Sequence, residues 1–213
     1  MTVVSVFAKT VGGIAGKARI YPDILQAAAK SLRAAEGDVI SDSFATHAGD
    51  RLILLMVHKK GADVSSLRDS IFDAAQKQAD GLGLFNNQTP DSAVSLEFSG
   101  GSQQFLLFVT GSDDAGFWNK IMTSEAGTAA DTGIFLAKSE GEYPTTARRC
   151  EAFAKSSFLG VCPVSLCETG IMREYVTPVA GLGFSLFKGK LIGPVDLFDS
   201  ALFDAARLTA SHT

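Results

Sequence analysis

Two glycine-containing segments near the start of the chain carry charged side chains beside apolar runs. The first segment spans residues 11–22 and places a basic pair, Lys17 and Arg19, directly after three glycines. The second is Thr46-His47-Ala48-Gly49-Asp50-Arg51, which lies between two apolar runs. Loops at the ends of strands are common places for binding and catalytic groups, and glycine lets the backbone approach a ligand closely. Both segments are therefore predicted to hold a small molecule.

The remaining composition is that of a globular protein. The chain has 213 residues, 46% of them hydrophobic, which is enough for one large or two small cores. Its net charge of −4 and pI near 5.4 argue against a nucleic-acid binder, because affinity for a phosphate backbone needs clustered Lys and Arg. No apolar run approaches the roughly 20 residues of a membrane-spanning helix, and no leader pattern opens the chain. We expect a cytoplasmic protein that binds neither nucleic acid nor membranes.

The first half of the chain predicts a strand, a helix, two strands and a second helix. Alternating or continuous apolar residues mark the strands, and apolar residues at helical spacing mark the helices. Pro22 suits the first turn of the first helix, Gly49-Asp50 suits a hairpin turn, and Asp63 or Ser65 can cap the second helix. In chain order these elements are residues 3–8, 22–36, 39–47, 51–58 and 63–83.

The second half gives weaker signals. A polar stretch at 85–92 predicts a loop, and an internal junction near 86–92 would connect two subassemblies of one domain spanning 1–213. Further strands are predicted at 93–98, 104–110 and 134–137, and Lys188-Gly189 predicts the turn of a late hairpin. Residues 200–209 alternate at helical period.

Several motifs in order resemble those of the bifunctional fructose-1,6-bisphosphate aldolase/phosphatase family of archaea and some bacteria. The resemblance covers most of residues 3–85 and about 180–207, with a weaker thread from 110 to 140. It implies a layered α-β-β-α sandwich with mixed or antiparallel sheets, and it implies assembly into homo-oligomers. The motifs are residues 5–22, Thr46-His47-Ala48-Gly49-Asp50, His58-Lys59-Lys60-Gly61, Gly116-Phe117-Trp118-Asn119 and residues 189–199.

The chain departs from that family at the positions that the resemblance assigns to magnesium. Family members carry aspartates where this chain has Thr10 and Arg51, a histidine where it has Lys17, and an Asp-Lys pair aligned on Gly111 and Ser112. Magnesium needs several oxygen ligands with net negative charge. Of the aligned carboxylates only Asp50 is kept, and the fixed charge of an arginine beside it repels a metal ion.

The chain is also shorter than the family. It has no counterpart of the segment that bears the Schiff-base lysine, because the remnant Gly141-Glu142-Tyr143 lacks both the lysine and the aspartates. The resemblance therefore implies that the magnesium-dependent phosphatase and the Schiff-base aldolase are both impaired in this chain.

If the family fold holds, cations gather at the ends of two neighbouring strands, with Asp50 as the carboxylate among them. Such a cluster favours an anion, and one lysine among several cations acquires a lowered pKa suited to base or imine chemistry. The predicted catalytic residues are Lys17, His47, Asp50 and Lys9. The predicted substrate-binding residues are Arg19, Arg51, Thr10, Tyr21 and Trp118, and no metal ligand is predicted. In the alternative interpretation, Lys17 and Arg51 only fill vacated metal space through salt bridges to Asp50 and Asp42.

The sequence supports a functional role less strongly for several other residues. A lone histidine at a strand end, such as His47, is as often a structural hydrogen bonder as an acid or base, and Trp118 also suits a core position. His58 belongs to no supporting pattern. The three cysteines, Cys150, Cys162 and Cys167, are an odd number without further Cys/His pairs, which argues against a disulfide framework and against a zinc site.

Three functions follow from these residues. The leading hypothesis is a metal-independent lyase, isomerase or cyclase that acts on an anionic or carbonyl-bearing small molecule and needs no cofactor. The second is a retained sugar-phosphate phosphatase or aldolase, for which magnesium would still be required. The third is a non-catalytic binding or scaffold protein.

Overall fold

A computed structural model of the chain describes residues 1–14, 19–84, 91–100, 102–110, 130–131, 134–139 and 179–196. Its first sheet holds four antiparallel strands in the order β4-β5-β1-β6. The two central strands, β5 and β1, are buried along nearly their whole length, as expected where a sheet is covered on both faces. In the order given, the four strands are Asp42–Ala48, Arg51–Lys59, Thr2–Thr10 and Ser92–Phe98.

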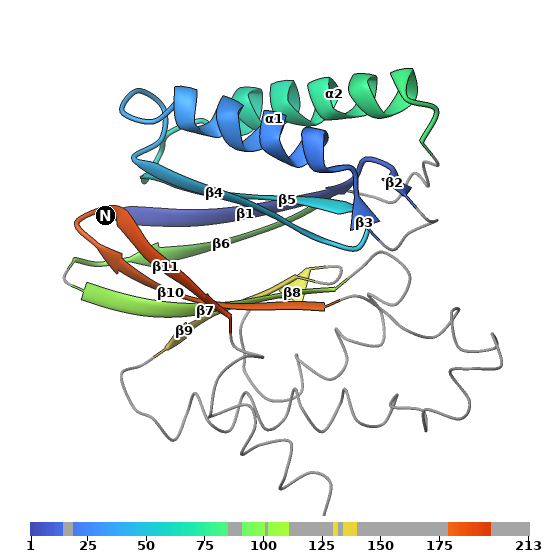
Figure 1. Cartoon of the computed structure of the whole chain (residues 1–213). Coiled ribbons are helices and arrows are strands. Elements are labelled where there is room, and N and C mark those ends of the chain that lie inside the picture. The colour runs from blue at the N-terminus through green and yellow to red at the C-terminus, as the bar shows by residue number, and fades with distance from the viewer. Residues whose placement is uncertain are drawn as a thin grey trace, which may run out of the picture.

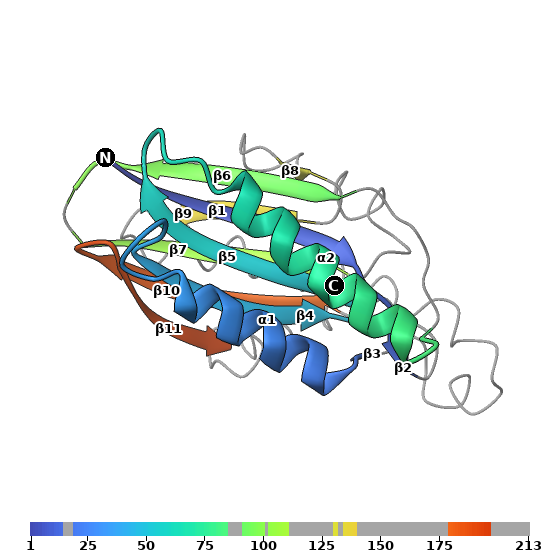
Figure 2. The same cartoon turned by 90° about the horizontal axis from the view of Figure 1, so that it is seen from above.

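Two helices cover one face of this sheet (Figures 1 and 2). The first helix, α1 (Pro22–Ala34), has proline in its first turn and buries residues four apart, Ile24, Ala28 and Leu32. The second helix, α2 (Ser65–Gly81), buries Ile71, Phe72, Ala75 and Ala79. Each helix therefore turns one apolar stripe toward the sheet.

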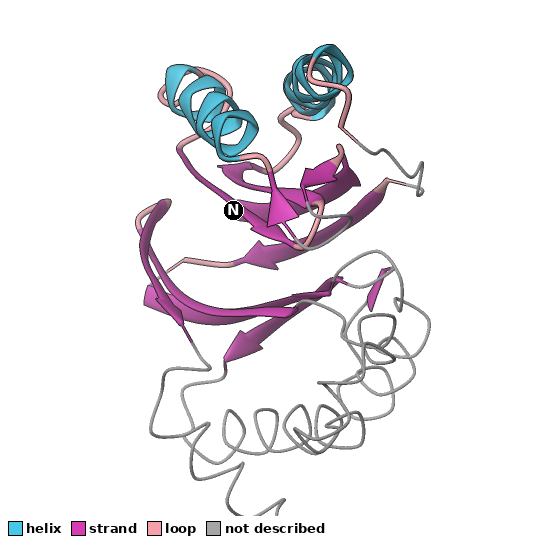
Figure 3. Ribbon diagram, turned by 45° about the vertical axis from the view of Figure 1, so that its right-hand side comes forward, coloured by secondary structure: helices cyan, strands magenta, loops and turns pink. Residues whose placement is uncertain are grey.

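A second antiparallel sheet packs against the opposite face of the first, so that the described layers run helices, sheet, sheet (Figure 3). Its strand order is β11-β10-β7-β9-β8. A separate short hairpin, β2 (Gly13–Ile14) with β3 (Arg19–Ile20), lies near the start of α1. The strands of the second sheet are β7 (Ser102–Thr110), β8 (Ala130–Asp131), β9 (Ile134–Ser139), β10 (Val179–Phe187) and β11 (Lys190–Asp196).

Alternation along β1 and β5 divides their side chains between two cores. Val6 and Ile53 belong to the core between the two sheets. Phe7 and Leu52, one residue away on each strand, belong to the core beneath the helices. Because side chains alternate between faces with a period of two, this assignment extends to the polar residues at the strand ends.

The turn between β10 and β11 fastens the second sheet to the first at one corner. The carboxylate of Asp42, the first residue of β4, accepts the backbone N–H of Leu191 at 2.7 Å and that of Ser43 at 2.9 Å. The Ser41 hydroxyl lies 3.0 Å from the carbonyl oxygens of both Val57 and Gly189, which share its single hydrogen. Short polar side chains thus join the two sheets where backbone pairing ends.

Asp42→Ala is expected to lower the free energy of unfolding by about 1–3 kcal/mol, because it leaves two part-buried N–H groups without their acceptor. Urea unfolding of the variant and the wild type measures the difference. The matched control is Asp38→Ala, since Asp38 is exposed in the preceding loop. Equal stabilities of the two variants would contradict the role given to this corner.

The strands and helices predicted from the sequence are confirmed within the described ranges, with shifts of a few residues at their ends. Gly49-Asp50 and Lys188-Gly189 are both hairpin turns. The N-cap residue of α2 is Val64 and not Asp63 or Ser65, although Asp63 accepts the Ser65 N–H at 2.8 Å. The predicted α/β class with antiparallel sheets is confirmed. The second outer helical layer, and the helix predicted at 200–209, lie outside the described residues.

One expectation about organisation differs from the structure. The polar stretch near 86–92 was expected to join two subassemblies, yet β6, which follows it, returns to the first sheet and pairs with β1. The chain changes sheets later, between β6 and β7, near Gly100. Long-range strand pairing decides this, and local composition does not carry that information.

No helix in the described part of the chain is long and apolar enough to cross a membrane.

Candidate functional site

The two glycine-containing segments meet at one end of the first sheet. Gly49, with φ of 59°, and Asp50 form the turn between β4 and β5, where Ala48 and Arg51 are the last pair. The backbone N–H of Val11, just past the end of β1, donates to the carbonyl of Asp50 at 3.3 Å. The sequence prediction that these segments share one site is therefore consistent with the backbone.

On the face toward the second sheet, Thr10 and Arg51 form a directly opposed pair. The Arg51 Nη2 atom donates to the Ser92 hydroxyl at 2.9 Å, and Ser92 is the first residue of β6. Thr10, Arg51 and Ser92 are each at most 3% exposed. The guanidinium group of Arg51 is thus enclosed at the end of the space between the sheets.

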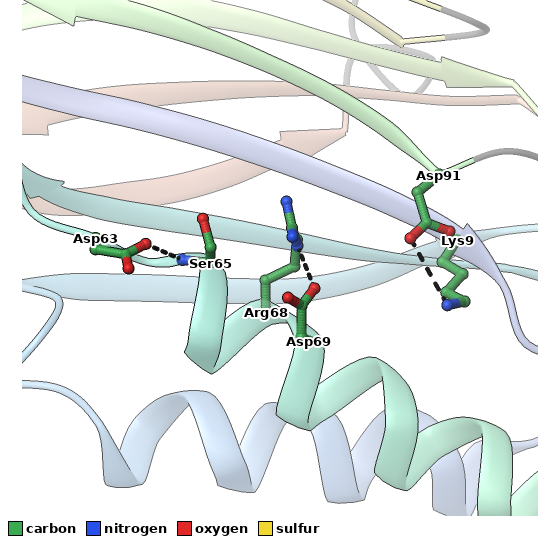
Figure 4. A network of polar contacts seen from close by, with 6 residues as sticks. All are labelled: Lys9, Asp63, Ser65, Arg68, Asp69 and Asp91. Atoms are coloured by element: carbon green, nitrogen blue, oxygen red, sulfur yellow. Dashed lines mark hydrogen bonds and ion pairs between the residues drawn. The ribbon is translucent and has the colours of Figure 1, made fainter.

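Lys9 lies on the other face, beneath the helices. Its ammonium group is 3.6 Å from the Asp91 carboxylate (Figure 4). The same group lies over the Phe72 ring of α2, 5.8 Å from the ring centroid. Arg68 of α2 lies nearby over the Phe7 ring and donates to Asp69 at 2.7 Å. Lys9 is therefore part of a balanced surface network of both charges, and it does not face Arg51.

His47 shares the helix-side row of Lys9, because both residues pair with Leu52. The imidazole is half-buried, and among the described residues its buried Nδ1 atom has no hydrogen-bond partner. Burial lowers the pKa of His47, the backbone of Gly49 opposes the shift, and the positive charge of Arg19 adds to it. His47 is thus favoured in its neutral form beside an exposed cation.

Lowering the pH is expected to destabilise the wild type more than His47→Gln. Unfolded histidine takes up a proton near pH 6.5, about its ordinary pKa, whereas folded His47 does so only at lower pH. The unfolded state then binds more protons, so this contribution to stability is complete above about pH 6.5 and is lost as the pH falls through the folded pKa.

Urea unfolding of both proteins at pH 7.5 and at pH 5.5 measures the effect. Other titrating groups are common to the two proteins and cancel in the comparison. A wild type that gains stability relative to His47→Gln on acidification would contradict the lowered pKa.

Asp50 is buried in a turn, and Tyr21 packs at the start of a helix. The Asp50 side chain is in the turn and only 1% exposed. Tyr21 precedes α1, its carbonyl accepts the Ile24 N–H at 3.1 Å, and its side chain packs on the core beneath the helices. Lys17, Trp118, Gly111 and the three cysteines lie outside the described residues.

The alternative partner proposed for Arg51 is placed elsewhere. Asp42 pairs with Val57, six positions along β5 from Arg51, which corresponds to roughly 20 Å. Its carboxylate instead accepts the two backbone N–H groups at the corner. A salt bridge between Asp42 and Arg51 is therefore wrong, because the two residues occupy opposite ends of the hairpin.

The described donor set does not fit a magnesium ion. Within the described ranges no three His, Cys, Asp or Glu side chains gather as a group that could hold a metal. Asp50 is followed directly by Arg51, and hard divalent ions need several oxygen ligands with net negative charge. The chemistry considered for this site therefore involves its side chains and no metal ion.

Sequence reasoning missed a third polar cluster. Ser5 of β1 bonds His58 of β5 and Ser95 of β6, at 2.9 and 2.7 Å. These residues occupy three different strands. Their meeting depends on the strand register, so no local motif predicts it. His58 had been assigned no supporting pattern.

Two antiparallel sheets stacked beneath a helical layer, with polar groups at the strand ends, define an α/β sandwich with a terminal polar site. The family described as Fructose-1,6-bisphosphatase matches residues 1–89 and 129–213, which is more than half of the chain. The chain therefore belongs to the fructose-1,6-bisphosphatase family, and the resemblance seen in its motifs is confirmed.

Three relatives, each named fructose-1,6-bisphosphate aldolase/phosphatase, align with part of the chain. The protein from Ignicoccus hospitalis is 40% identical over 88 residues, 39% of this chain and 23% of that protein. The protein from Sulfurisphaera tokodaii is 36% identical over 103 residues, covering 46% and 26%, and that from Thermococcus onnurineus is 36% identical over 86 residues, covering 38% and 23%. The chain covers about a quarter of the length of these relatives.

Proposed function

We propose that this chain is a metal-independent enzyme, a lyase, isomerase or cyclase, acting on a small anionic or carbonyl-bearing molecule at the end of the first sheet. The observation that carries the proposal is the half-buried His47, whose buried Nδ1 atom has no hydrogen-bond partner among the described residues and whose pKa is lowered by burial and by the positive charge of Arg19. A neutral imidazole accepts a proton near pH 7, and a guanidinium group binds an oxyanion.

The chemistry that suits this pair is proton abstraction next to a carbonyl. Arg19 would hold the carbonyl or carboxylate oxygen while His47 removes a proton from the adjacent carbon. If that carbon also carries a hydroxyl, passing the hydroxyl proton to the held oxygen and returning the abstracted proton to the former carbonyl carbon gives the isomeric carbonyl compound. If instead the next carbon, β to the carbonyl, carries a leaving group, its departure with the bonding electrons as the carbon–carbon double bond forms gives a lyase product. Both outcomes balance without an oxidant, a reductant or a metal.

The contacts of Lys9 and Arg51 support a proposal with fewer acting residues than the sequence suggests. Lys9 is held by Asp91 and Phe72, and Arg51 is enclosed on the opposite face of the sheet. We therefore keep His47 and Arg19 as the acting pair, with Lys17 and Trp118 as further candidates from the sequence. Self-association into a homo-oligomer is part of the same proposal.

The competing function is a sugar-phosphate phosphatase or aldolase. It is favoured by the names of the relatives, which are fructose-1,6-bisphosphate aldolase/phosphatases. Release of phosphate or of triose phosphates from fructose 1,6-bisphosphate, dependent on added Mg²⁺, would support that function over ours.

Proton abstraction can be tested before the substrate is known. In D₂O with EDTA, the protein is incubated with a panel of 2-oxo acids and sugar phosphates, and NMR follows exchange of the hydrogen next to the carbonyl for deuterium. We expect exchange in at least one compound, reduced by about 10²–10⁴-fold in His47→Gln. Arg19→Gln tests the proposed oxygen-binding group, and its matched control is Arg33→Gln, at the far end of α1. No exchange across the panel, or undiminished exchange in His47→Gln, would count against the proposal.

A further inference from the structure

A hydrogen-bonded relay of three side chains crosses the first sheet away from the site described above. The Ser95 hydroxyl is 2.7 Å from that of Ser5, and the Ser5 hydroxyl is 2.9 Å from Nε2 of His58. The other ring nitrogen of His58, Nδ1, is 3.0 Å from the carbonyl of Lys59. We call these three side chains the Ser95–Ser5–His58 relay.

One carbonyl sets the direction of every hydrogen bond in the relay. The Lys59 carbonyl can only accept, so Nδ1 of His58 carries the hydrogen in the neutral ring and Nε2 is an acceptor. Ser5 must then donate to Nε2. Since a hydroxyl has a single hydrogen, Ser95 must donate to Ser5. The proton of Ser95 therefore points inward, along a path that ends on a basic nitrogen.

The two ends of the relay differ in exposure. Ser5 is 3% and His58 is 6% exposed, whereas Ser95 is exposed on β6. Strand β6 is one of the two edge strands of the first sheet (Figure 2), and its helix-side residues Ala93, Ser95 and Glu97 are all exposed. A hydroxyl oxygen at the surface is thus connected through a buried hydroxyl to a buried imidazole.

We propose that Ser95 is a nucleophile that accepts an acyl group, with His58 as its base acting through Ser5. Hydroxyl nucleophiles are activated by an adjacent base that takes their proton as the new bond forms. In this step the Ser95 oxygen bonds to the acyl carbon and the bond from that carbon to its leaving group breaks. The Ser95 proton passes to Ser5, and the Ser5 proton passes to His58.

The relay also defines the class of acyl donor. His58 is buried behind Ser5, so it presents no acid to a leaving group at the surface. The leaving group must therefore depart as a stable anion, as the thiolate of a thioester or the phenolate of an aryl ester does. The products are an ester on Ser95 and a thiol or phenol, which takes up the proton released from His58 through solvent.

An alkyl fluorophosphonate is the probe that tests this proposal on the full chain. Its phosphorus bonds to an activated serine oxygen while fluoride leaves, and intact mass with peptide mapping locates the adduct. We expect one adduct, on Ser95, and none on Ser99, which is also exposed, just past the end of β6, but is outside the relay. Labelling of Ser99 at the rate of Ser95, or no label on Ser95, would overturn the proposal.

Variants separate the relay from simple exposure. Ser5→Ala and His58→Gln are expected to slow labelling by about 10²-fold, because general-base assistance is lost. Ser5→Thr keeps the hydroxyl and should retain labelling, whereas a purely structural role predicts no such rescue. Thermal unfolding of each variant checks that it folds, and the comparison of Ser95 with Ser99 in the wild type needs no variant. Unchanged labelling in folded Ser5→Ala would also overturn the proposal.

Discussion

Phe184→Ala is expected to lower the free energy of unfolding by about 3–5 kcal/mol, enough to unfold a marginally stable domain. Phe184 of β10 is 4% exposed and lies in the core between the two sheets. Its ring stacks on Phe105 of β7 at a centroid distance of 5.2 Å, and it meets the edge of Phe44 of β4 at 5.5 Å. The substitution removes a ring that contacts Phe44 across the two sheets and stacks on Phe105 within the second sheet.

Urea unfolding measures this loss, and the chain offers a matched control. Phe187 is on the same strand but is 46% exposed, so Phe187→Ala is expected to change the stability by no more than about 0.5 kcal/mol. A small effect of Phe184→Ala, comparable to that of Phe187→Ala, would mean that the two sheets do not depend on this aromatic packing.

A double-mutant cycle of Arg51→Met and Ser92→Ala is expected to give a coupling energy of about 1.5–3 kcal/mol. The reason is the buried hydrogen bond from Nη2 of Arg51 to the Ser92 hydroxyl, since bonds to charged groups are stronger than neutral ones. Arg51→Met alone should therefore destabilise the protein measurably, whereas Arg33→Met, on the exposed end of α1, should not.

The cycle also decides between two roles of Arg51. Additive effects of the two substitutions would show that Ser92 does not hold the guanidinium group of Arg51. Strong coupling would keep Arg51 as a structural cation at the position where the family resemblance places an aspartate.

Local patterns predicted most elements because their physical signals are local. The continuous apolar run Leu52–Val57 predicted a strand that is covered on both faces. Lys188-Gly189 predicted a hairpin turn, and the positive φ angles of 50° and 77° at these residues agree with such a turn. The spacing of Ile24, Ala28 and Leu32 likewise defined the buried face of α1.

The candidate site was predicted less completely, because it depends on which face each side chain occupies. Lys9 and Arg51 were expected in one pocket, but the register pairs Lys9 with Leu52 and Thr10 with Arg51, which puts the two cations on opposite faces. A shift of one residue would reverse that result, and sequence alone does not fix the register. The same dependence hid the relay of Ser5, His58 and Ser95.

If His47 and Arg19 form an anion site that needs no metal, the His47 ring must respond to an anion in the presence of EDTA. NMR of the His47 ring during a titration with inorganic phosphate measures this response. We predict a saturable shift of the His47 signals that is unchanged by Mg²⁺ and that requires about tenfold more phosphate in Arg19→Gln, since a charge-assisted hydrogen bond is worth at least about 1.5 kcal/mol. A His47 ring that responds to phosphate only after Mg²⁺ is added would contradict a metal-independent anion site.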